Sequence, residues 1–74
     1  MDGVVQIQAN RRRIEILMAN KGMTVSDIMR VSGLARQTVR SIVHGKSVKP
    51  VTFGRFSKAM GVPVEDIIDD REHK

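Results

Sequence analysis

The sequence predicts an all-α fold: a compact domain of five short helices, of which the second and third meet at a tight glycine turn. Apolar residues recur at helical spacing, as with Ile14, Leu17 and Met18. Glycines stand where helical segments should stop. The chain has 74 residues, 41% of them hydrophobic, and no cysteine. It must therefore fold around a small apolar core without disulfides.

Three regions are expected: an N-terminal arm over residues 1–9, the helical domain over 10–69 and a polar tail over 70–74. In the arm, Val5 and Ile7 alternate with glutamines, which suits a strand, although Ile7 could also extend a helical face. The arm lacks the basic and apolar regions of a signal peptide. No apolar run approaches the roughly 18 residues of a membrane span. We therefore expect no contact with a membrane.

The first helix is expected from about Asn10, as N-cap, to Asn20, with Gly22 just beyond its end. Residues 11–13 are three consecutive arginines in its first turn. The positive end of the helix dipole disfavours cations there by a few tenths of a kcal/mol each, roughly. Contact with phosphate or plain solvation would each account for this placement, and the sequence leaves both open.

The second helix carries the clearest local signal. Thr24 is its expected N-cap, and Asp27, three residues later, can complete a capping box. The helix has room to extend only to about Val31. Gly33 follows and can adopt the positive φ that a sharp turn requires.

The third helix is expected from about Ala35 to His44, with Val39, Ile42 and Val43 on its buried face. The exposed positions carry polar side chains, namely Arg36, Gln37, Thr38, Arg40, Ser41 and His44. Because the turn is short, the second and third helices must cross at a large angle. The polar face of the third helix then projects outward, as in a helix-turn-helix.

Two further helices are expected after a basic loop over residues 46–50. The fourth helix is predicted over residues 52–60, with Thr52 as its N-cap and both phenylalanines facing inward. A short fifth helix is predicted over residues 64–69, with acidic residues in its first turn, where the dipole favours them.

The charge distribution indicates a polyanionic partner. The net charge is +5. Residues 10–49 contain nine Lys/Arg and two Asp/Glu, so this region is basic. Residues 62–74 contain two Lys/Arg and five Asp/Glu, so this end is acidic. An outward helix with polar side chains fits the major groove of duplex DNA, which is about 12 Å wide. With only two aromatic residues, both expected in the core, stacking on single strands is disfavoured. We therefore predict binding to double-stranded DNA.

The residue types on the third helix suit base reading. Arginine can pair with the acceptors of guanine, and glutamine with the acceptor and donor of adenine. The predicted base-contacting residues are Arg36, Gln37, Arg40 and Ser41. The predicted backbone-contacting residues are Thr24, at a helix N-terminus, with Thr38, His44, Lys46, Ser47 and Lys49. Each of these side chains could alternatively be part of a solvated surface.

Catalysis and metal binding are not expected. The sequence shows no grouping of acid, base and nucleophile and no phosphate-binding loop. Without cysteine, and with His73 in the tail as the only other histidine besides His44, a metal site is disfavoured. We predict no enzyme, cofactor or metal.

The segment from Thr24 to Gly45, followed by residues 50–68, resembles the lambda-repressor-like helix-turn-helix family of phage repressors, Cro proteins and small bacterial regulators. The matching positions are Met23, Thr24, Ile28, Gly33, Leu34, Val39, Ile42, Gly45, Lys46 and residues 59–62. The resemblance implies five helices, with the DNA-binding unit in the second and third. It also implies base contacts by the four residues named above, and adds Val25 to the backbone contacts. It further implies a bacterial or phage-encoded protein in the cytoplasm, associated with the nucleoid.

The chain departs from the family pattern at several positions. Val25 replaces a common glutamine, and Met29 replaces a usual alanine. Met18 and Val43 stand where some phage repressors have a buried arginine–glutamate pair, and losing both partners together can be neutral. Ala35 is a poor N-cap, weaker by about 1 kcal/mol than the frequent threonine.

Together these features predict a sequence-specific transcriptional regulator, a repressor that binds a palindromic operator. Because one helix reads only a few base pairs, we expect a homodimer with half-sites about 34 Å apart. The candidate dimer surfaces are the fifth helix and the arm, which could alternatively cover the core or contact the DNA backbone. The alternative function is an antitoxin-type or other protein-interaction module whose DNA binding is autoregulatory. The chain could also be a fragment of a longer repressor.

Overall fold

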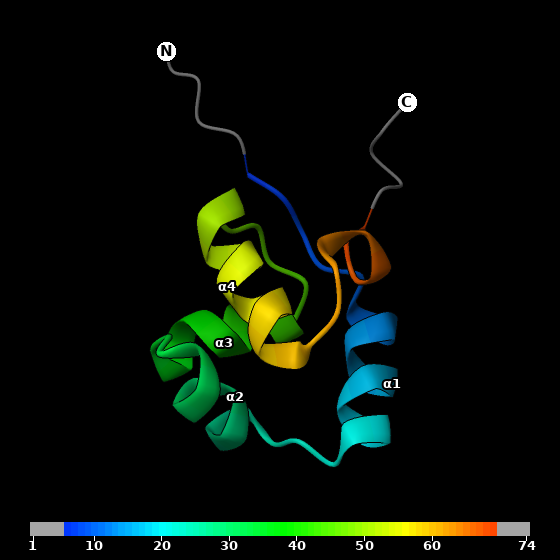
Figure 1. Ribbon diagram of the computed structural model, residues 1–74. Helices are drawn as coiled ribbons and strands as arrows, with labels where there is room; N and C mark the ends of the chain where they lie inside the picture. Colours follow the sequence, from blue (N-terminus) through cyan, green and yellow to red (C-terminus); the bar gives the residue numbers. More distant parts are fainter. Residues whose placement is uncertain (1–5, 70–74) are drawn as a thin grey trace.

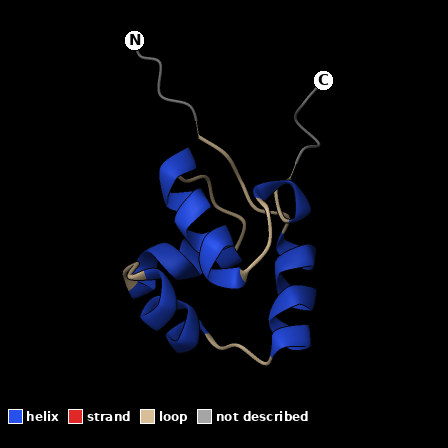
Figure 2. Ribbon diagram, in the orientation of Figure 1, coloured by secondary structure: helices blue, strands red, loops and turns tan. Residues whose placement is uncertain are grey.

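The computed structural model describes residues 6–69, and within them the fold is all-α, as the sequence predicts. Figure 2 shows helices joined by short loops. No helix in this part of the chain is both long and apolar enough to cross a membrane. The elements, labelled in Figure 1, are α1 (Arg11–Lys21), α2 (Val25–Ser32), α3 (Arg36–Val43), α4 (Pro50–Met60) and the 3₁₀ turn η1 (Val64–Asp66).

The predicted count of five helices is wrong, because the described chain has four α-helices and the fifth element is one 3₁₀ turn. After that turn, Ile68 forms an antiparallel bridge with Ala9, and the N–H of Asp69 donates to the carbonyl of Gln8 over 2.8 Å. Backbone groups that pair with the arm cannot also continue a helix. The competing hydrogen bonds therefore end the segment after one turn.

The predicted start of the fourth helix is also wrong. α4 begins at Pro50, with Lys49 in the N-cap position, so Thr52 lies inside the helix. The N–H of Phe53 donates to the carbonyl of Lys49 over 3.0 Å. Proline suits the first helical position because its missing N–H would have no intrahelical partner there.

The N-terminal signals of α1 and α2 act as predicted. The Asn10 side chain accepts from the N–H of Arg13 over 3.1 Å. At α2, the Thr24 hydroxyl accepts from the N–H of Asp27 over 3.1 Å, and the Asp27 carboxylate accepts from the N–H of Thr24 over 2.9 Å. This reciprocal capping box fixes the start of α2. Gly33, at φ 76°, ends α2 in the left-handed conformation and turns the chain into α3.

The core draws side chains from all of these elements and from the arm. The aromatic rings of Phe53 and Phe56 stack with centroids 6.5 Å apart. Around them lie the other buried apolar side chains, Ala9, Ile14, Ile28, Val39, Ile42, Met60 and Ile67. Each short helix is therefore held in place by the side chains that it contributes to this common cluster.

The arm is extended and lies between two distant parts of the chain. Ile7 and Val48 exchange both backbone hydrogen bonds at 2.9 Å. The N–H of Asn10 donates to the carbonyl of Ile67 over 2.7 Å, and Ala9 is buried. Within the described residues the arm therefore covers the core, and it connects the loop before α4 to the segment after η1.

Replacing Ala35 with serine should stabilise the domain by about 1 kcal/mol. Ala35 holds the N-cap position of α3 in an extended conformation but has no side-chain oxygen to accept from the first turn. The measurement is the denaturant midpoint without DNA. Ala19→Ser, at an exposed position inside α1, is the control and should give no gain. An equal effect of both substitutions would contradict the assignment of Ala35 as an incomplete cap.

Gly54→Ala should stabilise the domain by up to about 1 kcal/mol, the difference in helix propensity. Gly54 lies within α4, and a β-carbon there would meet nothing within 4 Å. Gly61→Ala is the contrasting variant. It should destabilise the domain because Gly61 has a φ of 77°. Thermal unfolding of both proteins tests the pair, and a loss of stability in Gly54→Ala would oppose the prediction.

The stability conferred by Asp27 should depend on pH. Hydrogen bonds from the Thr24 N–H and the Arg30 side chain, over 2.9 and 3.0 Å, lower the pKa of Asp27. The folded pKa lies below that of the unfolded chain, about 3.9. This stabilisation is therefore present above that pH and is lost as pH falls through the folded pKa. At pH 7 the midpoint of thermal unfolding should be higher for the wild type than for Asp27→Asn. The difference between the two midpoints should close below about pH 4. A constant gap would contradict this.

Candidate nucleic-acid interface

The outer face of α3 forms the centre of the candidate site. Val39 and Ile42 are fully buried on its inner face. On the opposite side is a hollow, called here the α3 hollow, which is lined by Arg36, Gln37, Arg40, Ser41, His44 and Lys46. All four side chains predicted to contact bases therefore line one surface. Ser41 is half-buried, whereas the other five are exposed.

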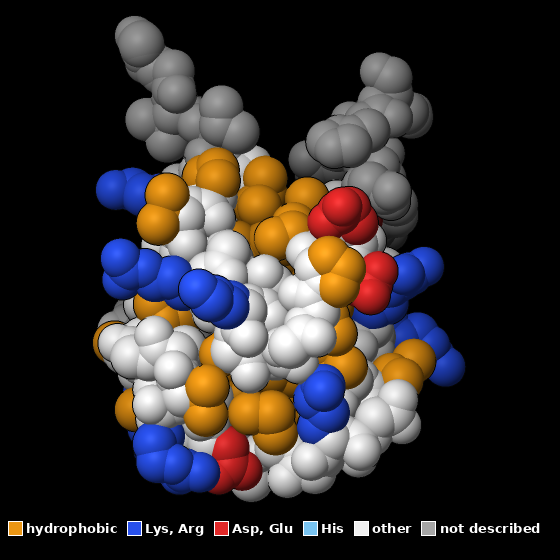
Figure 3. All heavy atoms as spheres, in the orientation of Figure 1, with side chains coloured by type: hydrophobic (Ala, Val, Ile, Leu, Met, Phe, Trp, Pro, Cys, Tyr) orange, Lys and Arg blue, Asp and Glu red, His pale blue; other side chains and the backbone are white. Residues whose placement is uncertain are grey.

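The α3 hollow suits an anionic ligand. Three of its lining residues are Lys or Arg, and none is Asp or Glu. The face of the molecule shown in Figure 3 differs, because it carries Asp and Glu side chains as well as basic and hydrophobic ones. Cations without interspersed acids raise the local concentration of a polyanion. The composition of the α3 hollow therefore suits a polyanion.

Three of the predicted backbone contacts lie at the loop from α3 to α4. Lys46, Ser47 and Lys49 are exposed there, and only Lys46 of these lines the α3 hollow. Val48, between them, is held to Ile7 of the arm by two backbone hydrogen bonds. The loop that presents these side chains is thus anchored at Val48, near the start of α4.

Of the other predicted backbone contacts, His44 lines the α3 hollow, whereas Thr24, Val25 and Thr38 lie outside it. Thr24 is exposed at the start of α2, where its N–H donates to Asp27. A phosphate at this helix end would therefore approach an existing carboxylate. Val25 and Thr38 are half-buried, and Val25 packs against the core.

Ser26 is a residue that the sequence analysis did not select. Its hydroxyl accepts from Nη2 of Arg36 over 3.4 Å, so α2 contacts a predicted base-reading side chain directly. The signal in the sequence is weak, since serine two residues after an N-cap is common on solvated helices. The contact gives the exposed guanidinium of Arg36 a hydrogen-bonding partner on α2.

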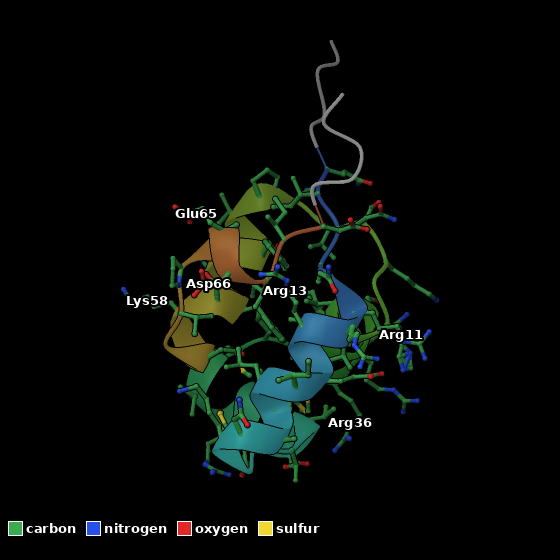
Figure 4. All side chains as sticks on the ribbon, turned by 90° about the vertical axis from the view of Figure 1, so that its right-hand side faces the viewer. Arg11, Arg13, Arg36, Lys58, Glu65 and Asp66 are labelled. Atoms are coloured by element: carbon green, nitrogen blue, oxygen red, sulfur yellow. The ribbon has the colours of Figure 1, made fainter. Side chains whose placement is uncertain are left out.

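A second hollow adjoins the first, and both include His44. Its lining residues are Gln8, Ala9, Asn10, Arg11, Arg12, His44, Gly45 and Asp69. The first turn of α1 therefore lies next to the C-terminal end of α3. Figure 4 shows Arg11 and Arg36 on one side of the molecule, with the acidic residues of η1 on the other.

The described residues contain no group of three or more His, Cys, Asp or Glu side chains arranged to hold a metal ion. The polar groups of the site are guanidinium, ammonium, amide and hydroxyl groups together with one imidazole. Their chemistry is that of hydrogen bonding and charge complementarity.

Comparison with known protein families agrees with this geometry. The model of the Cro/C1-type HTH DNA-binding domain matches residues 13–72, a range that contains the entire α3 hollow. Searches of the curated proteins and of the solved structures found no significant match. The match covers most of the chain and confirms the resemblance to lambda-repressor-like proteins. The chain therefore belongs to the family of Cro/C1-type helix-turn-helix DNA-binding domains.

Proposed function

We propose that this DNA-binding transcription regulator is a repressor that acts by occupying a palindromic operator as a homodimer. The observation that carries the proposal is the composition of the α3 hollow. Four side chains able to contact bases lie on a helix whose opposite face is buried, and His44 and Lys46 line the same hollow just after the helix ends. Occupancy of an operator requires no chemistry beyond this surface.

In the proposed complex, α3 enters the major groove. Arg36 and Arg40 can each pair with guanine, and Gln37 with adenine, whereas Ser41 can contact either kind of base pair. The proposed backbone contacts hold the helix in register: Thr24, Val25, Thr38, His44, Lys46, Ser47 and Lys49. Phosphate contacts supply affinity and orientation, and base contacts supply discrimination.

A homodimer follows from the size of the reading element. α3 has eight residues and so is about 12 Å long at 1.5 Å per residue. An element of this length reads only a few base pairs. Two copies on half-sites about 34 Å apart would double the length of the site. They would also add a second set of contacts, which multiplies the affinity.

A second candidate function is a protein-interaction module with autoregulatory DNA binding. One feature supports it, an apolar hollow between α1 and η1. Its lining residues are Arg13, Ile16, Leu17, Asn20, Val62, Asp66 and Ile67. Ile16 is 50% exposed there, so the surface has apolar area available to a partner protein.

Selection from a random duplex pool, followed by mass measurement of the complex, tests both candidates. The repressor proposal expects an enriched palindrome bound by two copies of the chain. Enrichment of no sequence would contradict it. A stoichiometric second protein, recovered with the chain from its own cells, would favour the interaction module.

Arg40→Ala and Lys46→Ala should affect binding to the selected duplex differently. Arg40→Ala should weaken the free energy of DNA binding by about 1–3 kcal/mol and relax discrimination at one base pair. Lys46→Ala should weaken binding about equally on all duplexes and lower the salt slope by about 1. Titrations at several salt concentrations measure both effects. Unchanged discrimination in Arg40→Ala would contradict its role in base reading.

A further inference from the structure

The first turn of α1 separates its three arginines into two environments. Nη1 of Arg13 donates to the carbonyl of Asp66 over 3.3 Å, which connects α1 to η1. Arg11 and Arg12 instead line the second hollow, with His44. The first turn contains no acidic residue. Two cations therefore remain at the helix end where the dipole disfavours them.

Arg11 and Arg12 lie beside the C-terminal end of α3. A β-carbon built on Gly45 would lie 3.8 Å from the β-carbon of Arg11 and 3.7 Å from the carbonyl of Ala9. His44, the residue before Gly45, lines both hollows. The two hollows therefore adjoin at His44, and the cations of the α3 hollow lie next to those of the first turn of α1.

Within residues 6–69, two acidic residues lie near Arg11 and Arg12. Nε of Arg11 lies 3.6 Å from Glu15, but the two side chains are 67% and 58% exposed. Exposed pairs of this kind contribute only about 0–1 kcal/mol, so a phosphate can replace the glutamate. Asp69 also lines the hollow. Among the described residues that line this hollow, two are arginines and one is acidic.

We propose that Arg11 and Arg12 bind backbone phosphates of the DNA, beyond those contacted by the loop after α3. This rests on the proposed DNA binding and extends the contact surface from Lys46 across His44 to α1. Both arginines precede residue 13, where the family match begins. The family match therefore assigns no role to either arginine.

The test is the salt dependence of binding by Arg11→Gln/Arg12→Gln. Each lost phosphate contact should lower the slope of log K against log salt by about 0.9, so the double variant should lose about 1.8. Between 50 and 200 mM salt, wild-type affinity should therefore fall about twelvefold more than that of the variant. The change should be the same on the selected duplex and on a scrambled one, because phosphates carry no sequence information.

The matched control is Arg55→Gln/Lys58→Gln, which removes the same net charge from exposed positions on α4. Figure 4 shows Lys58 on the side of the molecule opposite Arg11 and Arg36. The control should keep the wild-type slope. Arg11→Lys/Arg12→Lys should restore the slope, since a phosphate contact requires the charge rather than the guanidinium. Unfolding midpoints without DNA show whether all variants are folded.

Equal slopes for the glutamine variant and wild type would overturn the inference. Equal losses in the glutamine variant and the control would also overturn it, because they would reflect net charge alone. Both results presuppose a duplex that the wild type binds. Failure of the wild type to bind any duplex would instead contradict the proposed function, so the two failures are distinguishable.

Discussion

The site depends on how α3 is fixed to the rest of the domain. An eight-residue helix is not stable alone, because so few hydrogen bonds do not offset the entropy of nucleation. Val39 and Ile42 are fully buried, and burial of each contributes about 1.5–3 kcal/mol. These two side chains hold the helix against the core. The direction in which Arg36, Gln37 and Arg40 point follows from them.

The arm has a larger structural role than its sequence indicates. Its backbone pairs with Val48 on one side and with residues 67–69 on the other. It thereby provides hydrogen-bonding partners for backbone groups after η1. Without the arm, these groups would need a helix longer than the single turn of η1. It also brings the start of α1 against the end of α3, where Gly45 lies close to Ala9 and Arg11. The cationic surface on α1 is a consequence of this packing.

Local sequence signals were sufficient to predict much of the fold. The capping box at Thr24 and the left-handed Gly33 depend on residues within one helical turn, and both were predicted from the sequence. The start of α4 at Pro50 could also have been read locally, since proline favours the first helical position. The pairing of Ile7 with Val48 could not, because it joins segments far apart in the chain.

The candidate site likewise has some features that the local sequence predicts and others that depend on how the helices pack. Helical periodicity alone placed the four predicted base-reading side chains on one face, and they line one hollow. The contact between Ser26 and Arg36 depends on how α2 packs against α3, which no local pattern specifies. The separation of Arg13 from Arg11 and Arg12 likewise depends on where η1 and Gly45 lie.

The two hydrogen bonds between Ile7 and Val48 also bear on the thermodynamics of recognition. Ordering a free loop on a ligand loses conformational entropy that subtracts from the affinity. A loop that is already held at Val48 loses less conformational entropy on binding. The segment that carries Lys46 and Lys49 is therefore partly ordered before any encounter. In the proposed complex, a change in the arm that released Val48 would lower the affinity through the entropy of association.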